Sequence, residues 1–335
     1  MFRKDALSYV PGDIVGGRYR VTGSLGRGGF GAVYSAVHTM TGQPMALKML
    51  TIDPSTTEDD VVERFYREAR ITAQLTDVHT VQVFDVGEAE NGPLFMAMEM
   101  LRGPPLDKLL RRLGQVNRPM SEAETIDIAL PILQSLSEAH KAGLVHRDLK
   151  PANIILAHKG DEQMVVKVLD FGIARTQDSS LTGQGTALGT PAYMSPEQVR
   201  GKPLDGRSDL YSLGIIMFRC LTGRMPFEHE DAFAQAFMHL SVPAPDPREI
   251  AEHPISDAIA EFVLCAMSKE PEERFDDART MRQALQEIRG GAFAGTPVAG
   301  TPVLAHVADA ENAIATRIET KPGGSLMDLL VDVQH

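Results

Sequence analysis

The sequence has no tryptophan, two cysteines and 6% aromatic residues among 335. So few cysteines exclude a disulfide-stapled secreted fold. We expect Cys220 and Cys265 to be buried thiols in a reducing cytoplasm, with a disulfide as the less favoured alternative. No apolar run approaches the ~20 residues of a membrane span, and the first ten residues lack the apolar core of a signal peptide. A cytoplasmic protein without a membrane segment is therefore expected.

Positive charge is also scarce, because 45 acidic residues face 33 lysines and arginines, for a formal net charge of −12. Such a surplus of negative charge repels polyanions, so nucleic acid is not expected as the main partner. The 43% of hydrophobic residues can form a substantial core. A chain of this length suits one large two-lobed domain or two ordinary ones.

Reactive side chains are concentrated in residues 146–153, which read HRDLKPAN. This stretch holds a carboxylate, a lysine and an amide, and Asp170 adds a second carboxylate after a short apolar run. Two carboxylates and an amide near a lysine suit a metal that bridges phosphates, with one acid left to orient a hydroxyl. Pro151 disfavours a helix interior, so we expect a loop.

A glycine-rich segment, residues 26–31 (GRGGFG), separates two runs with strand composition. A lone motif of this kind is a weak signal, and its dinucleotide-binding form must open a helix. Because a strand follows here, the segment is predicted to be the tip of a β-hairpin. Glycines at such a tip let backbone N–H groups approach phosphate oxygens. An ordinary flexible hairpin is the alternative if the motif stands alone.

Lys48 lies in an apolar predicted strand, residues 44–50, where an isolated lysine usually reaches the sheet edge. Residues 57–75 are predicted to form a helix with Thr57 and Asp60 as its capping box. Glu68 falls on the apolar stripe of that helix, where an unpaired carboxylate would be costly. A buried Lys48–Glu68 ion pair would explain both the lysine in an apolar strand and the carboxylate on an apolar helix face.

The remaining patterns predict a sheet-rich first part and a helical second part that meet at residues 103–105 (GPP). A helix over residues 121–142 has Ser121 and Glu124 as a capping box, and Pro131 should bend it. After residue 290 the composition changes to a Gly/Pro linker and a tail that we expect to be flexible, in which residues 325–333 could form a short amphipathic acidic helix. The alternative is a docking segment with phosphorylatable Thr296 and Thr301. The other predicted elements are strands at 19–25, 32–38, 81–86, 94–101, 154–156 and 164–169, and a buried helix at 208–221.

These motifs, together with residues 170–172 (DFG) and 189–197 (GTPAYMSPE), resemble those of eukaryotic-like serine/threonine protein kinases of the bacterial type. The resemblance runs from roughly residue 14 to residue 288. It implies an α+β bilobal kinase fold over residues 13–290, with a small lobe at 13–102 and a large lobe at 103–290. Residues 1–12 would be an N-terminal extension and residues 291–335 a linker and tail.

The resemblance implies that the chain transfers a phosphoryl group from ATP, with Mg²⁺ or Mn²⁺, to serine or threonine hydroxyls of protein substrates. Asp148 would accept the hydroxyl proton, Lys150 would offset charge on the phosphoryl group, and Asn153 and Asp170 would hold the metal. The residues implied to bind ATP are Leu25, Gly26, Arg27, Gly28, Gly29, Phe30, Gly31, Val33, Ala46, Lys48, Glu68, Met98, Glu99 and Leu101.

Other positions are expected to have structural roles. His146 would pack under residues 170–172, Asp209 would brace the catalytic loop (residues 146–153), and Glu197 with Arg274 would form a buried ion pair. We expect the other histidines to be incidental. Lys150 and Thr190 match the serine/threonine pattern rather than the tyrosine pattern.

Regulation by autophosphorylation is a further expectation. Thr182 and Thr186 lie ahead of Thr190 in a Ser/Thr-rich segment, and Arg147 precedes Asp148, where an arginine can dock a phosphorylated loop. The alternative is an unmodified, solvated loop. The resemblance also suggests a homodimer through the small lobe. Many relatives continue into a membrane helix and a sensor domain, so the chain is either a soluble kinase or a catalytic fragment.

Two rival functions are disfavoured. A pseudokinase that only binds ATP or acts as a scaffold would have lost one of its catalytic or metal positions, yet Lys48, Asp148, Asn153 and Asp170 are all present. A small-molecule kinase of the antibiotic-phosphorylating type would lack the segment at residues 189–197.

Overall fold

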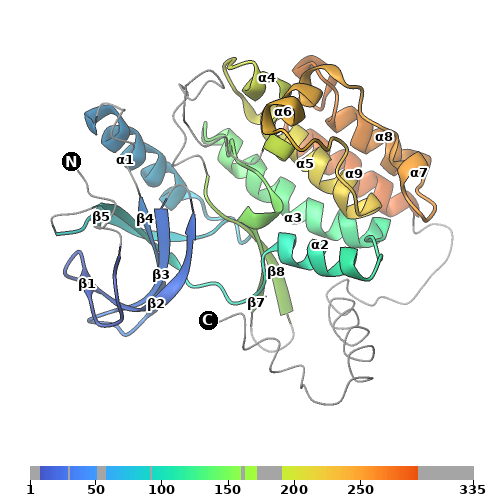
Figure 1. Cartoon of the computed structure of the whole chain (residues 1–335). Coiled ribbons are helices and arrows are strands. Elements are labelled where there is room, and N and C mark those ends of the chain that lie inside the picture. The colour runs from blue at the N-terminus through green and yellow to red at the C-terminus, as the bar shows by residue number, and fades with distance from the viewer. Residues whose placement is uncertain are drawn as a thin grey trace, which may run out of the picture.

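A sheet-rich lobe and a helical lobe meet around a short β-hairpin, as Figure 1 shows for this computed structural model. The structure describes residues 8–28, 31–50, 58–90, 93–159, 163–171 and 191–292. The strands come first in the chain, and the helical lobe follows a single crossing segment. The expected α+β bilobal fold is confirmed.

The small lobe is built on a six-stranded antiparallel sheet of order β1-β2-β3-β4-β6-β5. Its register places Val33 opposite Lys48 and Ala46 opposite Met98, so the predicted nucleotide-binding residues lie on neighbouring strands. The strands are β1 (Ile14–Val15), β2 (Tyr19–Gly28), β3 (Gly31–His38), β4 (Pro44–Leu50), β5 (Val83–Glu88) and β6 (Leu94–Glu99).

Helix α1 (Glu58–Gln74) covers part of this sheet. Phe65 and Ala69 are buried in a cluster with Leu50, Val83 and Met96 of the sheet. Burying a side chain as large as that of Phe65 contributes ~1.5–3 kcal/mol. This packing fixes which face of α1 turns inward, and Glu68 lies on that face with 3% of its surface exposed.

The large lobe is organised around α5 (Gly206–Thr222), which is buried along nearly its whole length. Helix α3 (Glu122–Lys141) starts at the predicted capping box of Ser121 and Glu124 and ends before Gly143, which has φ +78°. Pro131 lies inside α3, and the bend predicted there stays a prediction. The other helices are α2 (Leu106–Gln115), α4 (Pro196–Val199), α6 (Ala232–Ser241), α7 (Pro247–Ile250), α8 (Asp257–Ala266) and α9 (Ala278–Ala292).

A two-stranded hairpin, β7 (Ile154–Lys159) and β8 (Gln163–Val168), lies where the lobes meet. The N–H of Val168 donates to His79 O at 2.7 Å, and the N–H of Val81 donates to Val168 O at 3.0 Å. On the other side, Gly103 has φ +145° and lies so close to β7 that a Cβ there would be 2.0 Å from Leu156 O. The hairpin is thus fixed to the connection between α1 and β5 and to the segment that crosses between the lobes.

Several predicted features lie outside the described residues: Gly29, Phe30, Thr57, Gly172, Thr182, Thr186, Thr190 and residues 293–335. Cys220 and Cys265 are both free thiols. Within the described part of the chain, no helix is both long and apolar enough to cross a membrane.

Candidate active site

Asp148 is the centre of the candidate site. Its Oδ2 accepts a hydrogen bond from Lys150 Nζ at 2.8 Å and a longer one from Asn153 Nδ2 at 3.4 Å. Asn153 Nδ2 also donates to the backbone oxygen of Asp148 at 2.9 Å. The side chains of Asp148 and Lys150 are 22% and 20% exposed, so the carboxylate is oriented and still accessible. The three residues that the sequence assigned to one site, Asp148, Lys150 and Asn153, are therefore in contact in the structure.

The buried carboxylate of Asp209 holds the loop that carries Asp148. It accepts backbone N–H groups from His146 at 2.8 Å and Arg147 at 2.9 Å, and His140 Nε2 lies 2.7 Å away. Arg147 needs such support because its φ of +65° is unfavourable for a residue with a side chain. Burial raises the pKa of Asp209, but His140 and these hydrogen bonds outweigh it and hold that pKa below the usual value. His140 thus has a bracing role that the sequence did not reveal.

His146 joins the catalytic loop to the second carboxylate. Its Nδ1 accepts the N–H of Asp148 at 3.2 Å, so Nε2 carries the hydrogen and donates to Leu169 O at 2.7 Å. Its ring packs on Phe171 with centroids 5.0 Å apart. The fully buried imidazole therefore positions the residues on both sides of Asp170, as predicted.

Lys48 of β4 forms an ion pair with Asp170, with Nζ 2.7 Å from Oδ1. Asp170 has φ +58°, which turns its carboxylate toward the small lobe. Burial acts to raise the pKa of Asp170, but the ammonium of Lys48 outweighs it, with smaller help from His146 and Lys150, and the pKa lies below its usual value. Asp170 is therefore ionised at neutral pH, as a metal ligand must be.

The predicted Lys48–Glu68 ion pair is wrong for this structure. Glu68 Oε1 lies 3.4 Å from Arg147 Nη1, and Lys48 is paired with Asp170. The helical phase correctly predicted that Glu68 is buried, since 5% of its side chain is exposed. The partner differs because α1 turns Glu68 toward the catalytic loop, where a guanidinium meets it.

Asn153 and Asp170 together fit a hard divalent cation. Asn153 uses its Nδ2 to hold Asp148, and its Oδ1 has no hydrogen bond among the described residues. Oxygen ligands of this kind are the ones Mg²⁺ prefers, completed by substrate phosphates. Within the described residues no group of three His, Cys, Asp or Glu side chains could hold a metal alone, so phosphate oxygens would be needed to complete the site.

The predicted adenine-binding residues form a small apolar cluster of their own. Ala46 and Met98 are buried together with Val81. Val33, Leu101 and Leu169, which are partly buried, pack against them. The cluster spans both lobes and therefore offers an apolar surface to a planar base.

Glu99, at the end of β6, is held by two donors. Lys167 Nζ of β8 lies 2.5 Å from its Oε1, and the N–H of Gln82 donates to the same oxygen at 2.8 Å. Lys167 also donates to Thr80 O at 3.2 Å. The crossing segment is thereby tied to β8, and nothing in the sequence pattern of β8 had marked Lys167.

The glycine-rich segment is described up to Gly28 and again from Gly31. Gly31 has φ +140°, and a Cβ there would lie 1.9 Å from Met49 O, so no side chain fits. Leu25 is 54% exposed. Arg27 Nη2 donates to Ser8 Oγ at 2.9 Å, which ties the hairpin arm to the residues before it.

Glu197 and Arg274 form the buried ion pair expected from the sequence, with two contacts of 2.8 and 2.9 Å. Burial raises the pKa of Glu197, but Arg274 outweighs it and lowers that pKa overall. Next to Glu197, Gln198 Nε2 donates to Arg147 O at 2.6 Å. Helix α4 is therefore tied to the catalytic loop.

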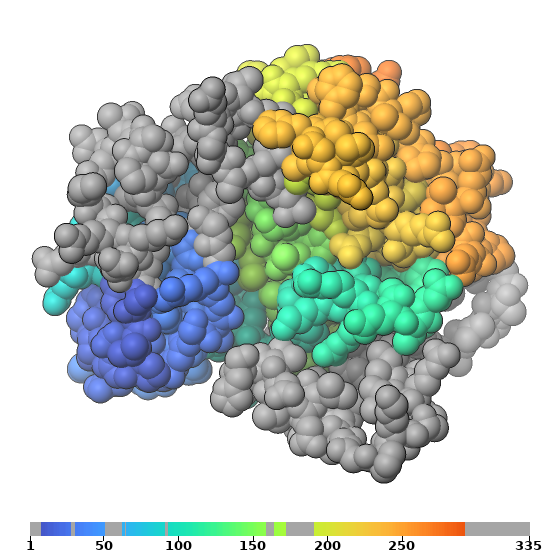
Figure 2. All heavy atoms as spheres, in the orientation of Figure 1, coloured from blue at the N-terminus to red at the C-terminus, as the bar shows by residue number. Residues whose placement is uncertain are grey.

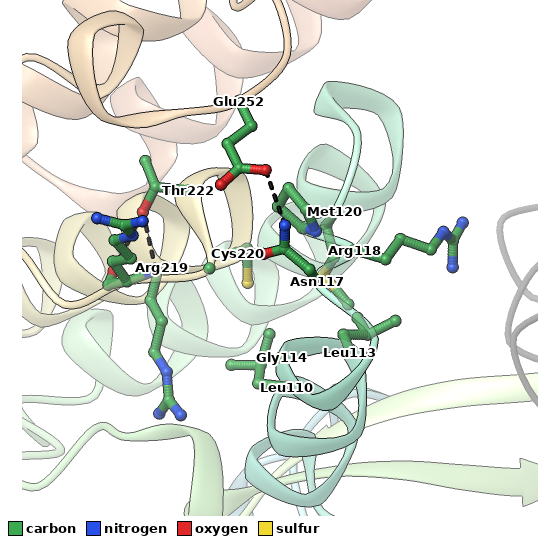
Figure 3. A pocket seen from close by; sticks show the side chains of 13 residues that line it. Leu110, Leu113, Gly114, Asn117, Arg118, Met120, Arg219, Cys220, Thr222 and Glu252 are labelled. Carbon is green, nitrogen blue, oxygen red and sulfur yellow. Dashed lines mark hydrogen bonds between the residues drawn. The ribbon is translucent and has the colours of Figure 1, made fainter. Parts of the chain in front are cut away.

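A separate pocket, whose lining does not include Asp148, lies between α2 and the end of α5 (Figure 3). It is bordered by Leu110, Cys220 and Arg219, and an Asn117–Glu252 hydrogen bond of 2.8 Å crosses its rim. Its volume of about 110 Å³ is too small for a nucleotide. Arg219 and Arg118 point in different directions from it, so their charges do not converge (Figure 3).

A model of the protein kinase domain matches residues 19–287. Among curated relatives, the serine/threonine-protein kinase pkn3 of Myxococcus xanthus is 40% identical over 290 residues, which are 85% of this chain and 52% of that protein. Serine/threonine-protein kinase PknL of Mycobacterium tuberculosis is 36% identical over 272 residues, 81% of this chain and 65% of that protein. The chain thus spans about half the length of the curated relatives it matches.

Solved structures show the same likeness. The PknI kinase domain of Mycobacterium tuberculosis superposes with a TM-score of 0.66 at 26% sequence identity, covering 84% of this chain and 99% of that one.

Proposed function

The chain belongs to the protein kinase family, of the bacterial serine/threonine type, and we propose that it transfers the γ-phosphoryl group of ATP to serine or threonine hydroxyls of proteins. The observation that carries this proposal is the group of Asp148, Lys150 and Asn153 held together by hydrogen bonds. It faces the Lys48–Asp170 pair, which comes from both lobes.

The kinase resemblance implies a role for each residue, and the geometry supports it. Asp148, oriented by Lys150 and Asn153, positions the acceptor hydroxyl and takes its proton. Lys150, 2.8 Å from that carboxylate, offsets charge on the phosphoryl group as it moves. Lys48 binds phosphate oxygens. The apolar cluster around Ala46 and Met98 holds the adenine and excludes water.

Asn153 and Asp170 are the residues that would hold Mg²⁺ or Mn²⁺. When bound, the cation would supply positive charge that offsets the charge of the phosphates. Lys48, which is paired with Asp170 at 2.7 Å, would supply a second cation for the phosphates.

The acceptor is proposed to be serine or threonine because Lys150 lies beside Asp148, as the serine/threonine pattern requires. The relatives are named as serine/threonine kinases, which supports the same choice.

We further propose that activation proceeds by autophosphorylation at Thr182 or Thr186. In the described structure the guanidinium of Arg147 contacts Glu68. A phosphothreonine carries nearly two negative charges and would compete for that guanidinium, which would release Glu68 toward Lys48. Phosphopeptide mapping after incubation with ATP tests this step. A fully active enzyme with both threonines unmodified would contradict it.

A cytoplasmic location suits a reaction that consumes ATP, and the free thiols of Cys220 and Cys265 agree with a reducing compartment. The homodimer through the small lobe stays a prediction.

The function is tested by transfer of radiolabel from ATP to the chain itself and to myelin basic protein, a generic acceptor. Wild type should label both, and Asp148→Asn should label neither while it keeps its thermal unfolding midpoint. Equal labelling by the two proteins would refute the role of Asp148.

A further inference from the structure

Gln198, in the short helix α4, links this helix to the backbone of the catalytic loop. Its amide nitrogen Nε2 donates to the carbonyl oxygen of Arg147 at 2.6 Å. Its amide oxygen Oε1 accepts the N–H of Ser195 at 2.9 Å. A backbone N–H can only donate and a carbonyl oxygen can only accept, so both contacts require this orientation of the amide. The two ends of the Gln198 amide therefore have separate tasks.

The carbonyl that Gln198 holds belongs to the peptide group directly before Asp148. The N–H of the same peptide group, that of Asp148, donates to His146 Nδ1 at 3.2 Å. The preceding N–H, that of Arg147, donates to Asp209 Oδ1 at 2.9 Å. Side chains from three separate parts of the chain thus fix the backbone from which Asp148 extends.

This backbone needs support because it is strained at Arg147. The φ of +65° lies in the left-handed region, which a residue with a Cβ avoids. Such a conformation persists only where the surrounding structure holds it. If the peptide group after Arg147 rotated, the carboxylate of Asp148 would move with it. A displacement of about 1 Å in a reacting group can lower a rate about 10²-fold.

Helix α4 is itself firmly placed, so Gln198 approaches the loop from a fixed point. Glu197, the preceding residue, is 4% exposed and forms two contacts of 2.8 and 2.9 Å with Arg274. Its Oε1 also accepts the hydroxyl of Ser208 at 2.6 Å. Figure 1 shows α4 at the top of the large lobe, and its yellow-green atoms form part of the surface visible in Figure 2. Gln198 thus reaches from a helix at the surface to the catalytic loop.

We propose that Gln198 is a positioning residue for the proton acceptor Asp148 and that it acts through the carbonyl of Arg147. This inference rests on the proposed kinase function. The residues assigned to the base and phosphates of ATP, such as Lys48 and Met98, lie on β4 and β6 of the small lobe. Loss of the Gln198 donor therefore lowers kcat and leaves the KM for ATP unchanged.

The alternative is that Gln198 only stabilises α4, because its Oε1 completes the capping box with Ser195. Gln198→Glu separates the two tasks. A carboxylate oxygen still accepts the N–H of Ser195, as Glu124 does for Ser121 at the start of α3. The same carboxylate cannot donate to the carbonyl of Arg147 and repels it.

The test measures phosphorylation of myelin basic protein by the full chain, both at steady state and in single turnovers. Single turnovers report the chemical step even where product release limits kcat. Ser195→Ala removes the hydroxyl that accepts the N–H of Gln198 and keeps the Nε2 donor. Gln283→Glu is the matched control, because it makes the same change at an exposed glutamine of α9, whose Nε2 donates to Glu287. Thermal unfolding of every variant is measured in parallel.

We expect Gln198→Glu to lower kcat and the single-turnover rate by about 10- to 100-fold. Its KM for ATP and its unfolding midpoint should stay at wild-type values. Ser195→Ala should lower the unfolding midpoint and keep the wild-type kcat, because only the cap of α4 is lost. Gln283→Glu should match wild type in every measurement.

Other results would overturn the proposal. If Gln198→Glu keeps the wild-type kcat, the contact with Arg147 does not position Asp148, and the kinase function stands. If the unfolding midpoint falls and the KM for ATP rises together with the loss of kcat, the role of Gln198 is structural. If Ser195→Ala lowers kcat as much as Gln198→Glu does, the cap of α4 matters and the donor does not. If wild type transfers no label, the kinase function fails and this proposal fails with it.

Discussion

Lys48 and Asp170 are joined by an ion pair of 2.7 Å although they belong to different lobes. Lys48 lies on β4 of the small lobe, and Asp170 follows β8 at the entrance to the large lobe. Glu68, the partner that helical phase suggested for Lys48, contacts Arg147 instead. Charge is therefore balanced in two ion pairs that join the lobes.

Replacing Lys48 should cost activity far more than stability. We expect Lys48→Met to lower kcat/KM for ATP by about 10²–10⁴, because the phosphates lose a cation in a partly buried site. Label transfer from ATP measures the effect. Lys202→Met removes an exposed lysine and is the control. Near-normal kinetics in Lys48→Met would contradict the assigned contact.

The Glu197–Arg274 pair should dominate the stability of the large lobe. Arg274→Met leaves a buried carboxylate without its partner, and we expect a loss of ~3 kcal/mol or more in the free energy of unfolding. Urea denaturation measures it. Arg289→Gln breaks a surface pair with Asp127, whose contact is 2.9 Å, and should cost ~1 kcal/mol or less. If the two variants lost equal amounts of unfolding free energy, burial of the Glu197–Arg274 pair would not explain its contribution to stability.

Local patterns predicted much of the fold, and long-range geometry accounts for what they missed. The strand over residues 44–50 and the Ser121–Glu124 capping box appear as predicted because their signals lie within a few residues. The helical periodicity of α1 correctly predicted that Glu68 is buried. Its partner could not be predicted, because that depends on how α1 is tilted against β4 and the catalytic loop.

The same limit applies to single polar residues in otherwise apolar runs. Lys167 looks like any lysine on a strand edge, and His140 like any histidine near a helix end. Their contacts with Glu99 and Asp209 arise only when segments distant in sequence cross. Residues that act through such crossings carry no local signature.

The buried imidazole of His239 should make stability depend on pH. Burial lowers the pKa of His239 to about 3, and the charge of Lys269 adds to this effect. An unfolded chain binds one more proton below the ordinary pKa of about 6.5. The free energy of unfolding should therefore fall as pH drops below that value, by at most ~1.4 kcal/mol per pH unit from this group.

His239→Gln provides the comparison, because glutamine does not titrate and its amide oxygen can still accept from Tyr211. Urea denaturation between about pH 7 and pH 5 should show a smaller loss of stability for this variant than for wild type. If the unfolding free energies of variant and wild type fell in parallel with pH, His239 would be excluded as the source of the pH dependence.

Two glycines in the large lobe should respond to alanine in opposite ways. Gly103→Ala places a Cβ 2.0 Å from Leu156 O at φ +145°, so the backbone must shift and stability should fall by more than ~1 kcal/mol. Gly114 lies in α2 with open space around it, and Gly114→Ala should raise stability by up to ~1 kcal/mol. Thermal unfolding measures both, and a stabilised Gly103→Ala would disprove the close approach.

The hairpin of β7 and β8 has a consequence for how the site assembles during folding. Asn153 and Asp170 flank its two strands, and the N–H of Leu169 donates to Asn153 O at 2.9 Å. Closing this short loop costs little chain entropy, so we expect the two residues proposed to hold the metal to come together early in folding. Lys48 is far away in sequence, and we expect it to reach Asp170 later, once the small lobe has folded and docked. On this expectation one part of the centre forms locally, and the contact that joins the two lobes is added last.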